Sequence, residues 1–253
     1  MFQPGHDQSI HRVRCEWGPV GAEAIAARLA VVVDVLSFTT TLSVAVERGI
    51  EVFPFAWKDS RAAEHALRHR ATLAVGRFEA LSRRDARHVS LSPASLASVE
   101  GVERLVLPSP NGSSIAFGLA DTGATVIGAC LRNADAVAHW LAPQVLAGAT
   151  CAVVPAGERW PDGSLRPAVE DLWGAGAVIA GLVDRGVTGL SPEARVAEQA
   201  FRAAGLPDEL RDVSSARELI EATFGDDVEV AAQLSVSAVV PVLRGESFTD
   251  AIG

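Results

Sequence analysis

A buried strand that ends in a carboxylate is the feature of this chain that most restricts its fold. Residues 31–33 are consecutive valines, a β-branched apolar run typical of a strand buried on both faces. Asp34 follows, then a cluster of hydroxyl residues and a helical pattern over 42–48. In open α/β sheets ligands bind at the carboxyl ends of strands, and a helix N-terminus can hold phosphate. The segment therefore predicts an α/β protein with a ligand site near Asp34.

Strand and helix patterns alternate along most of the chain. Strands are predicted at 28–35, 51–56, 72–75, 104–108, 125–129 and 150–155, with late strands at 228–232 and 239–243. Helices are predicted after residue 34 and at 60–70, 91–99, 113–119, 134–141, 168–185, 191–205 and 214–224. This alternation favours a mainly parallel sheet with helices on both faces. The 253 residues fit a single domain, with room for a smaller C-terminal subdomain from about residue 191.

Composition excludes several classes of protein. The net charge of -9 argues against a nucleic-acid-binding protein, which would normally be basic. No apolar stretch is long enough to span a membrane, and residues 1–12 lack the apolar core of a signal peptide. Three scattered cysteines indicate neither a disulfide framework nor a zinc site. We therefore predict a cytoplasmic protein without membrane or nucleic-acid partners, which could form a homo-oligomer on base rates alone.

Polar side chains follow five of the predicted strands. If those strands are parallel, the loops after them share one edge of the sheet and converge on one site. In chain order the candidates are Asp34, Ser37, Thr39 and Thr40; Arg77; Asn111, Gly112 and Ser113; Arg132 and Asn133; and Gly157, Glu158, Arg159 and Arg166, followed by Glu170 and Asp171.

These residue types suit the chemistry of phosphate esters. The four acidic residues offer hard oxygen ligands, which Mg²⁺ prefers together with substrate phosphate and water. The four arginines can form forked hydrogen bonds to phosphate or carboxylate. The hydroxyl and amide side chains can orient oxygens without adding charge. The set predicts phosphoryl transfer to, or hydrolysis of, an acidic small molecule.

Each candidate also has a purely structural interpretation. Asp34 and Asn133 could simply cap helices. Glu170 and Asp171 could be ordinary acids in the first turn of a helix, where they complement its dipole. The arginines could be surface residues, and Trp160 could line the pocket or only pack structurally. His65 and His69 have the i,i+4 spacing of a metal pair, but no acidic partner is near in sequence, so a surface helix face is favoured.

Taken in order, these segments resemble the 2-phosphosulfolactate phosphatase (ComB-like) family. The resemblance runs from about residue 31 to 182 and weakens towards the C-terminus. It implies a three-layer α/β/α fold, Mg²⁺-dependent hydrolysis of phosphate esters of 2-hydroxycarboxylic acids and, for the best-known members, a role in coenzyme M biosynthesis. The segments are Val-Val-Val-Asp-Val-Leu-Ser-Phe-Thr-Thr at 31–40, Pro-Asn-Gly-Ser at 110–113, Arg-Asn-Ala-Asp-Ala-Val at 132–137, Ala-Gly-Glu at 156–158 and Val-Glu-Asp-Leu-Trp-Gly-Ala-Gly at 169–176.

The chain departs from the family pattern in three places. Ser37 stands where the pattern has arginine, which removes an expected anion contact. A Gly-Glu-Arg-like segment is reduced to Gly76 and Arg77, and residues 235–238 lack an acidic residue that is common near the C-terminal strand. Arginines later in the chain could compensate for the first change: Arg132, Arg159 or Arg166. The substrate could therefore differ from 2-phosphosulfolactate.

The resulting hypothesis is a magnesium phosphatase with Asp34 at its centre. Asp34 and Glu170 are the predicted metal ligands, and Asp34, Glu158 and Asp171 the predicted catalytic residues. Adjacent helical residues point about 100° apart, so only one of Glu170 and Asp171 should face the metal. The loop at 111–113 would hold phosphate oxygens, and the arginines would hold the acid groups of the substrate.

Two questions remain open at the level of sequence: which group attacks phosphorus, and whether the protein is an enzyme. Asp34 could attack phosphorus itself, or metal-activated water could do so. Leu36 breaks the Asp-x-Asp-x-Thr signature of haloacid-dehalogenase phosphatases, and the chain has no P-loop motif, so both of those classes are disfavoured. A small-anion-binding or regulatory protein with the same fold but no catalysis is the second function class.

Overall fold

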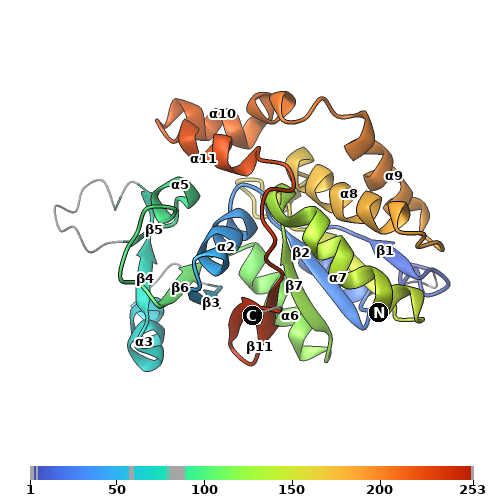
Figure 1. The fold of residues 1–253 in the computed structure, drawn as a ribbon, viewed down its shortest axis with the longest axis horizontal. Coiled ribbons are helices and arrows are strands. Elements are labelled where there is room, and N and C mark those ends of the chain that lie inside the picture. The colour runs from blue at the N-terminus through green and yellow to red at the C-terminus, as the bar shows by residue number, and fades with distance from the viewer. Residues whose placement is uncertain (1–2, 4, 57–59, 78, 80–88, 252–253) are drawn as a thin grey trace.

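A ten-stranded, mostly parallel sheet forms the centre of the fold (Figure 1). The computed structural model describes residues 3, 5–56, 60–77, 79 and 89–251. Two parallel groups of strands are joined by a hairpin. In sheet order, the first group contains β1 (Val13–Cys15), β8 (Cys151–Pro155), β2 (Leu29–Val33) and β7 (Thr125–Ala129). The hairpin consists of β11 (Pro241–Arg244) and β12 (Ser247–Asp250). The second group contains β3 (Glu51–Phe55), β6 (Arg104–Pro108), β4 (Thr72–Val75) and β5 (Val89–Ser90).

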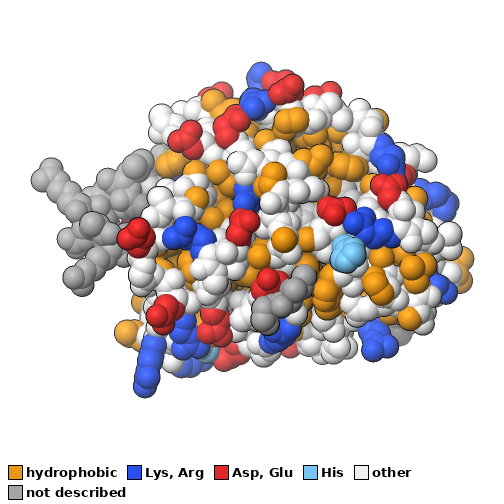
Figure 2. Space-filling view, viewed as in Figure 1, with side chains coloured by type: hydrophobic (Ala, Val, Ile, Leu, Met, Phe, Trp, Pro, Cys, Tyr) orange, Lys and Arg blue, Asp and Glu red, His pale blue; other side chains and the backbone are white. Residues whose placement is uncertain are grey.

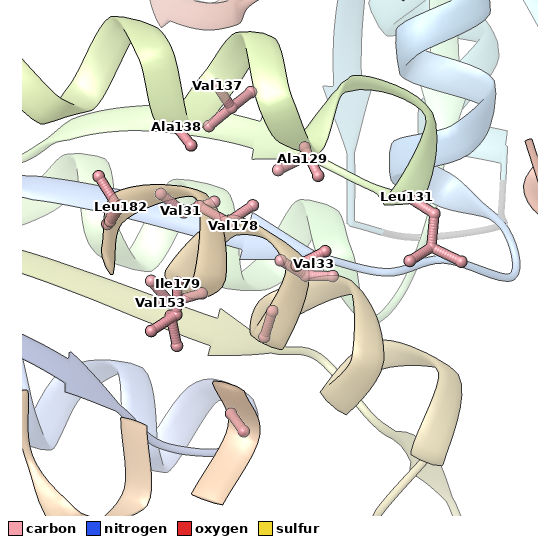
Figure 3. Packing of buried hydrophobic residues seen from close by; sticks show 14 of the residues in the cluster. Val31, Val33, Ala129, Leu131, Val137, Ala138, Val153, Val178, Ile179 and Leu182 are labelled. Atoms are coloured by element: carbon pink, nitrogen blue, oxygen red, sulfur yellow. The ribbon is translucent and has the colours of Figure 1, made fainter. Parts of the chain in front are cut away.

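Helices cover both faces of the first group. Alternate residues of a strand point to opposite faces, so Val31 and Val33 pack with one set of helices while Ala30 and Val32 pack with the other. On the Val31 face lie α7 (Ala134–Leu146) and α8 (Val169–Asp184), with α9 (Pro192–Ala203) beside α8; Figure 3 shows Val178, Ile179 and Leu182 of α8 against Val31 and Val153. On the other face lie α1 (Gly18–Ala24), α2 (Phe38–Glu47) and α6 (Gly112–Asp121). The predicted three-layer α/β/α fold is confirmed.

The hairpin corrects the prediction that the strand ends share one parallel edge. β11 is antiparallel to β7, β12 to β11, and β3 to β12, so the second group runs opposite to the first along the sheet. The strand ends instead meet through two crossover helices. α2 leads from β2 to β3, and α6 leads from β6 back to β7. The N-termini of these two helices lie together, and the candidate site is built there.

The C-terminal third is more helical than predicted. After α9 come a 3₁₀ turn (Asp208–Asp212), α10 (Ser214–Glu221) and α11 (Gly225–Ala231), with α11 against α5 (Pro93–Leu96). The strand predicted at 228–232 is wrong. Val228 and Ala231 are buried while Glu229 is exposed, which is the spacing of a helix face.

The predicted surface position of the histidine pair is also wrong. His65 and His69 lie on α3 (Ser60–His69) and pack against phenylalanines of β3. The His65 ring lies 4.9 Å from that of Phe55, and the His69 ring stacks 4.2 Å from that of Phe53. Burial, the neighbouring His69 and Arg68 lower the pKa of His65. The two histidines therefore help α3 to pack against β3 and do not form a surface face of the helix.

The surface charges are mixed, and the three cysteines form no disulfide, as the composition predicts. Figure 2 shows acidic and basic side chains interspersed over one face of the molecule. Cys15, Cys130 and Cys151 are free and buried. Of the helices that the structure describes, none combines the length and the apolar character needed to cross a bilayer.

Candidate active site

The carboxylate of Asp34 joins the N-termini of α2 and α6. One oxygen, Oδ1, accepts a hydrogen bond from the backbone N–H of Phe38, the first residue of α2, at 3.2 Å. The other, Oδ2, accepts one from the backbone N–H of Gly112, the first residue of α6, at 3.1 Å, and lies 3.5 Å from Ser109 Oγ. Each helix N-terminus carries partial positive charge. Asp34 therefore caps a helix, as one interpretation predicts, and also stands where an anion site is expected.

Thr39 and Thr40 shape the turn that presents Asp34. Thr39 Oγ1 accepts from the Asp34 backbone N–H at 2.9 Å and donates to the Asp34 carbonyl at 2.7 Å. Thr40 Oγ1 donates to the Val35 carbonyl at 2.7 Å. Both side chains are buried. Their predicted role in substrate binding is corrected to a structural one, because their hydroxyls are used by the backbone of the turn.

The two acids at the start of α8 have different surroundings. Asp171 Oδ1 accepts from the Val35 backbone N–H at 2.7 Å, and its Oδ2 accepts from the Gly157 backbone N–H at 2.9 Å. Asp171 thus ties the ends of β2 and β8 together, which gives the predicted catalytic residue a structural task. Glu170 is buried, and no described residue donates a hydrogen bond to it. Of the pair, Glu170 has the free oxygens.

Glu158 begins the short strand β9 (Glu158–Arg159), which pairs with β10 (Leu165–Arg166). Its Oε2 accepts a hydrogen bond from Asn111 Nδ2 at 3.2 Å. Burial, together with the charges of Asp34 and Glu170, raises the pKa of Glu158 to about 7, while Arg166 opposes the shift. A carboxyl group with a pKa near neutrality can both accept and release a proton at working pH.

We call Asp34, Glu158, Glu170 and Asp171 the carboxylate cluster. Burial raises the pKa of Asp34, and Glu170 adds to the shift. Burial and then Asp34 and Glu170 raise the pKa of Asp171 well above its ordinary value. No described Lys or Arg side chain donates a hydrogen bond to the cluster. The site thus concentrates carboxyl groups, and Arg166 offsets part of their charge at Glu158 without a hydrogen bond to it.

The raised pKa of Glu158 makes the folding stability of the protein depend on pH. Between about pH 4.5 and pH 7 the folded protein keeps a proton on Glu158 that the unfolded chain has lost, so folding stability falls as pH rises through this window. In EDTA, we expect Glu158→Gln to raise the melting temperature at pH 8 by about 2–4 °C, the shift that roughly 1 kcal/mol gives. At pH 4 the two proteins should melt alike. Glu23→Gln, exposed on α1, is the control, and equal melting curves at pH 8 would contradict the assignment.

A cavity of about 490 Å³ opens beside the cluster. Five of the predicted site residues line it: Asp34, Ser37, Arg77, Asn111 and Glu158. The wall formed by the C-terminal helices includes Ser215, Leu219 and Phe224. The site therefore combines residues that are up to 190 positions apart in the sequence.

Arg77 occupies the space beside Ser37. It follows β4, and its Nη2 donates to Ser37 Oγ at 2.5 Å while its Nε donates to Asp227 Oδ2 at 2.5 Å. Sequence analysis named Arg132, Arg159 or Arg166 as the arginine that could compensate for Ser37; this is corrected, because the basic group beside Ser37 is Arg77. Asp227, on α11, is a residue that sequence reasoning missed, because the segment around it was predicted as a strand.

Arg132 and Asn133 do not reach the cavity. They end a 3₁₀ turn (Leu131–Asn133) after β7. Arg132 pairs with Glu47 at 2.8 Å and with Gln233. Asn133 Oδ1 accepts from the Cys130 backbone N–H at 2.9 Å, and its Nδ2 donates to two carbonyls. Both predicted ligand residues therefore hold the fold. Asn133 precedes α7, but its side chain makes no capping hydrogen bond to that helix and instead closes the 3₁₀ turn through Cys130.

The remaining predicted residues lie around the site. Ser113 is fully buried, and its Oγ has no partner among the described residues. Arg166 donates to Ser215 Oγ at 3.1 Å and lies over the Trp160 ring at 5.8 Å, so it borders the cavity through Ser215. Arg159 is exposed and donates to the Gly163 carbonyl of its own hairpin, which corrects its predicted role.

Gly157 is required for its backbone. Its φ is +67°, a conformation that favours glycine, and a Cβ atom there would lie 2.8 Å from Leu165 Cδ1 and 3.0 Å from the Arg166 carbonyl oxygen. Its N–H donates a hydrogen bond to Asp171, so Gly157 stabilises the carboxylate cluster although it does not line the cavity.

Helix N-termini and arginine side chains both bind phosphate, so a cavity lined by Arg77, with Asp34 held between two helix N-termini, suits an α/β enzyme that acts on phosphate esters. Comparison with known proteins agrees. The family model of 2-phosphosulpholactate phosphatase matches residues 20–246, which include the whole site. The chain therefore belongs to the 2-phosphosulfolactate phosphatase family and is a phosphoric monoester hydrolase.

Two bacterial relatives support the same placement. A probable 2-phosphosulfolactate phosphatase of Deinococcus radiodurans is 33% identical over 223 residues, which cover 85% of this chain and 87% of the relative. A probable 2-phosphosulfolactate phosphatase of Thermus thermophilus is 33% identical over 221 residues, which cover 86% of this chain and 88% of the relative. The similarity extends over nearly the full length of all three proteins.

Proposed function

We propose that this protein is a Mg²⁺-dependent phosphatase that hydrolyses 2-phosphosulfolactate or a related 2-phospho-hydroxycarboxylic acid. One observation carries the proposal: the Asp34 carboxylate lies between two helix N-termini, inside an acidic cluster that opens onto a cavity containing Arg77. The names of the two bacterial relatives support the choice of substrate. A role in coenzyme M biosynthesis would follow if 2-phosphosulfolactate is the preferred ester.

The carboxylate cluster fits a magnesium ion. The described residues contain no group of three or more His, Cys, Asp or Glu side chains arranged as ready ligands. Magnesium needs fewer, because it commonly uses one or two carboxylates and completes its shell with phosphate and water. Asp34 and Glu170 would hold it, since Glu170 has free oxygens and each Asp34 oxygen keeps a lone pair. When bound, the ion would neutralise phosphate charge and make an attacking water more acidic.

The residues of the chain itself supply proton transfer and orientation. Ionised Glu158 accepts a proton from the water that attacks phosphorus, and Asn111 holds Glu158 in place. The bond from phosphorus to the ester oxygen breaks, the leaving alkoxide takes a proton from solvent water, and Glu158 returns the proton it accepted to solvent. The products are inorganic phosphate and the free 2-hydroxy acid. A cation held by Asp34 and Glu170 would offset two of the charges that raise the pKa of Glu158 and so favour the ionised form that accepts a proton at neutral pH.

We assign Asp34 to metal binding rather than to attack on phosphorus. Both of its oxygens accept backbone N–H hydrogen bonds, which stabilise the carboxylate charge and lower its reactivity as a nucleophile. Direct attack by water would invert the configuration at phosphorus, whereas a covalent intermediate on Asp34 would retain it. A substrate with a chiral, oxygen-labelled phosphorothioate, hydrolysed in isotopically labelled water, therefore separates the two routes, and retention would overturn the assignment.

The proposed function is tested by phosphate release from a panel of 2-phospho-hydroxy acids. We expect release with Mg²⁺ and a loss of about a thousandfold or more in EDTA, restored by added Mg²⁺. Release that EDTA does not reduce would contradict the metal requirement. Folded protein that releases phosphate from no ester would contradict the phosphatase proposal and favour a non-catalytic anion-binding protein.

A further inference from the structure

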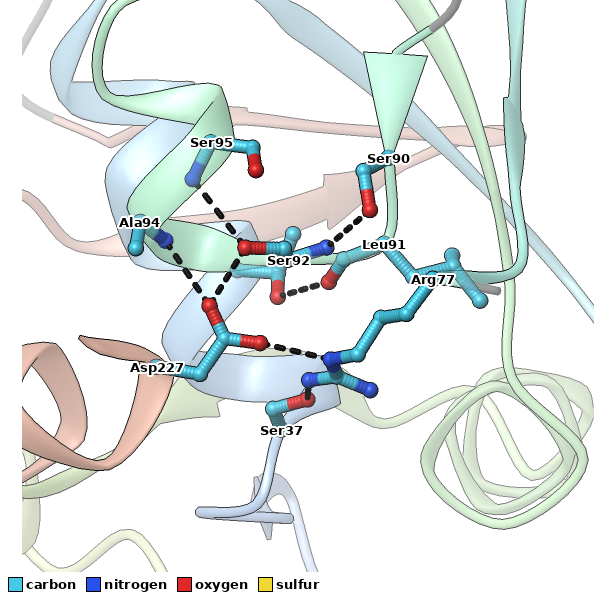
Figure 4. Close-up of polar contacts among 9 residues, drawn as sticks. Ser37, Arg77, Ser90, Leu91, Ser92, Ala94, Ser95 and Asp227 are labelled. Atoms are coloured by element: carbon cyan, nitrogen blue, oxygen red, sulfur yellow. Dashed lines mark hydrogen bonds and ion pairs between the residues drawn. The ribbon is translucent and has the colours of Figure 1, made fainter. Parts of the chain in front are cut away.

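Arg77 is the single basic side chain among the described residues that line the cavity. Its side chain is 17% exposed, so most of its charge is removed from water. Figure 4 shows the guanidinium between Ser37 and Asp227. Nε and one Nη2 hydrogen are used in these two contacts, and Nη1 has no partner among the described residues. The guanidinium thus retains donors for a ligand in the cavity.

Asp227 fixes the orientation of that guanidinium. Its side chain is 1% exposed, and its Oδ2 accepts from Arg77 Nε at 2.5 Å. The second oxygen, Oδ1, accepts from Ser92 Oγ and, at 3.2 Å, from the Ala94 backbone N–H at the start of α5 (Figure 4). The carboxylate is therefore held from both sides. Asp227 does not line the cavity, so it acts on a ligand only through Arg77.

We propose that Asp227 is a positioning residue that directs Arg77 towards a second acidic group of the substrate, a carboxylate or a sulfonate. This inference rests on the proposed function and extends it from phosphate-ester chemistry to substrate choice. In the proposed function the carboxylate cluster would hold a cation that binds the phosphate. The cluster and its cation leave the other acid groups of a 2-phospho-hydroxy acid without a positive partner, and Arg77 is the basic group that the cavity offers.

The geometry explains why an aspartate is needed at this position. An arginine recognises an anion through two parallel N–H donors, and this recognition depends on the orientation of the guanidinium plane. Arg77 has a flexible stem, and Ser37 supplies one neutral contact. The buried charge pair with Asp227 fixes the plane before the substrate arrives. Loss of Asp227 should therefore weaken the contact with the acid group while Arg77 and its charge are retained.

The test measures discrimination between two esters. 2-Phosphosulfolactate carries two further acidic groups, and isopropyl phosphate carries none. We expect Asp227→Asn and Arg77→Gln each to lower the ratio of kcat/KM for the first ester to that for the second by about tenfold or more, mostly through KM. The double variant should lower the ratio no further than Arg77→Gln alone, because Asp227 acts through Arg77. The inhibition constant of 3-sulfolactate, which lacks phosphate, should rise by a similar factor.

The neighbouring residue offers a matched control. Asp226 is exposed on the same helix, and Asp226→Asn should leave the ratio unchanged. If Asp227→Asn does not fold, Ser92→Ala removes one contact of Asp227 and should lower the ratio by a smaller factor. Equal losses for both esters, or additive effects in the double variant, would overturn the inference and leave the phosphatase proposal standing. A wild type that hydrolyses neither ester would instead contradict the proposed function.

Discussion

Asp34→Asn is expected to abolish phosphate release, with a fall in turnover of about a thousandfold or more. The change removes the charge of a carboxylate that lines the cavity and lies between two helix N-termini. An asparagine oxygen can accept from the N–H of Phe38 or of Gly112, but its amide nitrogen then faces the other donor. We expect a stability loss of about 1–3 kcal/mol as well. Phosphate release and thermal unfolding of the same preparation measure both effects.

The folded state of the variant must be separated from its chemistry. Circular dichroism should show the native spectrum at a temperature well below the lowered melting point. Asp121→Asn, at the exposed end of α6, makes the same chemical change outside the site and should keep full activity. Turnover by Asp34→Asn within about tenfold of the wild type would disprove the central role of Asp34.

Gly112→Ala should have the second largest effect, on activity and on stability together. A Cβ atom at this position would lie 2.4 Å from Phe38 Cδ1 and 2.9 Å from Asp34 Oδ2, distances that force the neighbours to move. Phe38 is buried and packs edge-on against Phe248, with ring centroids 6.4 Å apart, so it has little room. We expect a loss of about 1–3 kcal/mol from overpacking and a fall of about a hundredfold in kcat/KM.

The same helix contains its control. Gly118 is also in α6, but a Cβ atom there meets nothing within 4 Å. Gly118→Ala should therefore stabilise the protein by about 0.5–1 kcal/mol and leave activity unchanged, because alanine favours helix more than glycine does. If the two alanine variants behaved alike, the close approach of α6 to Asp34 would not matter for the reaction.

Local patterns in the sequence were sufficient for one half of the site. The valine run before Asp34 identified the strand, and the Asn111–Gly112 turn and the acids Glu170 and Asp171 marked two helix N-termini. These features depend on a few consecutive residues, so the sequence displays them directly. The pattern could not tell Glu170 from Asp171, because the difference lies in the backbone N–H groups of Val35 and Gly157, which come from distant strands.

Contacts between distant segments account for what the sequence did not reveal. Arg77 and Asp227 are 150 positions apart, and nothing near either residue indicates the other. Valines at 228 and 230 favoured a strand, but the segment forms a helix that packs against α5 and buries Val228, so tertiary contacts override the local propensity. Arg132 shows the opposite error. It follows a strand like the true site residues, yet Glu47 and Gln233 take up its guanidinium.

The place of the β11–β12 hairpin has a consequence for how the chain reaches its native state. These two strands follow every other described strand in the sequence, yet they lie in the middle of the sheet. During synthesis the two parallel groups can form separately, but they have no shared ladder until residues 241–250 leave the ribosome. Contacts of such long sequence separation slow folding. The open edges of β7 and β3 are exposed meanwhile, so chaperone binding is expected to concentrate on chains that stop short of residue 241.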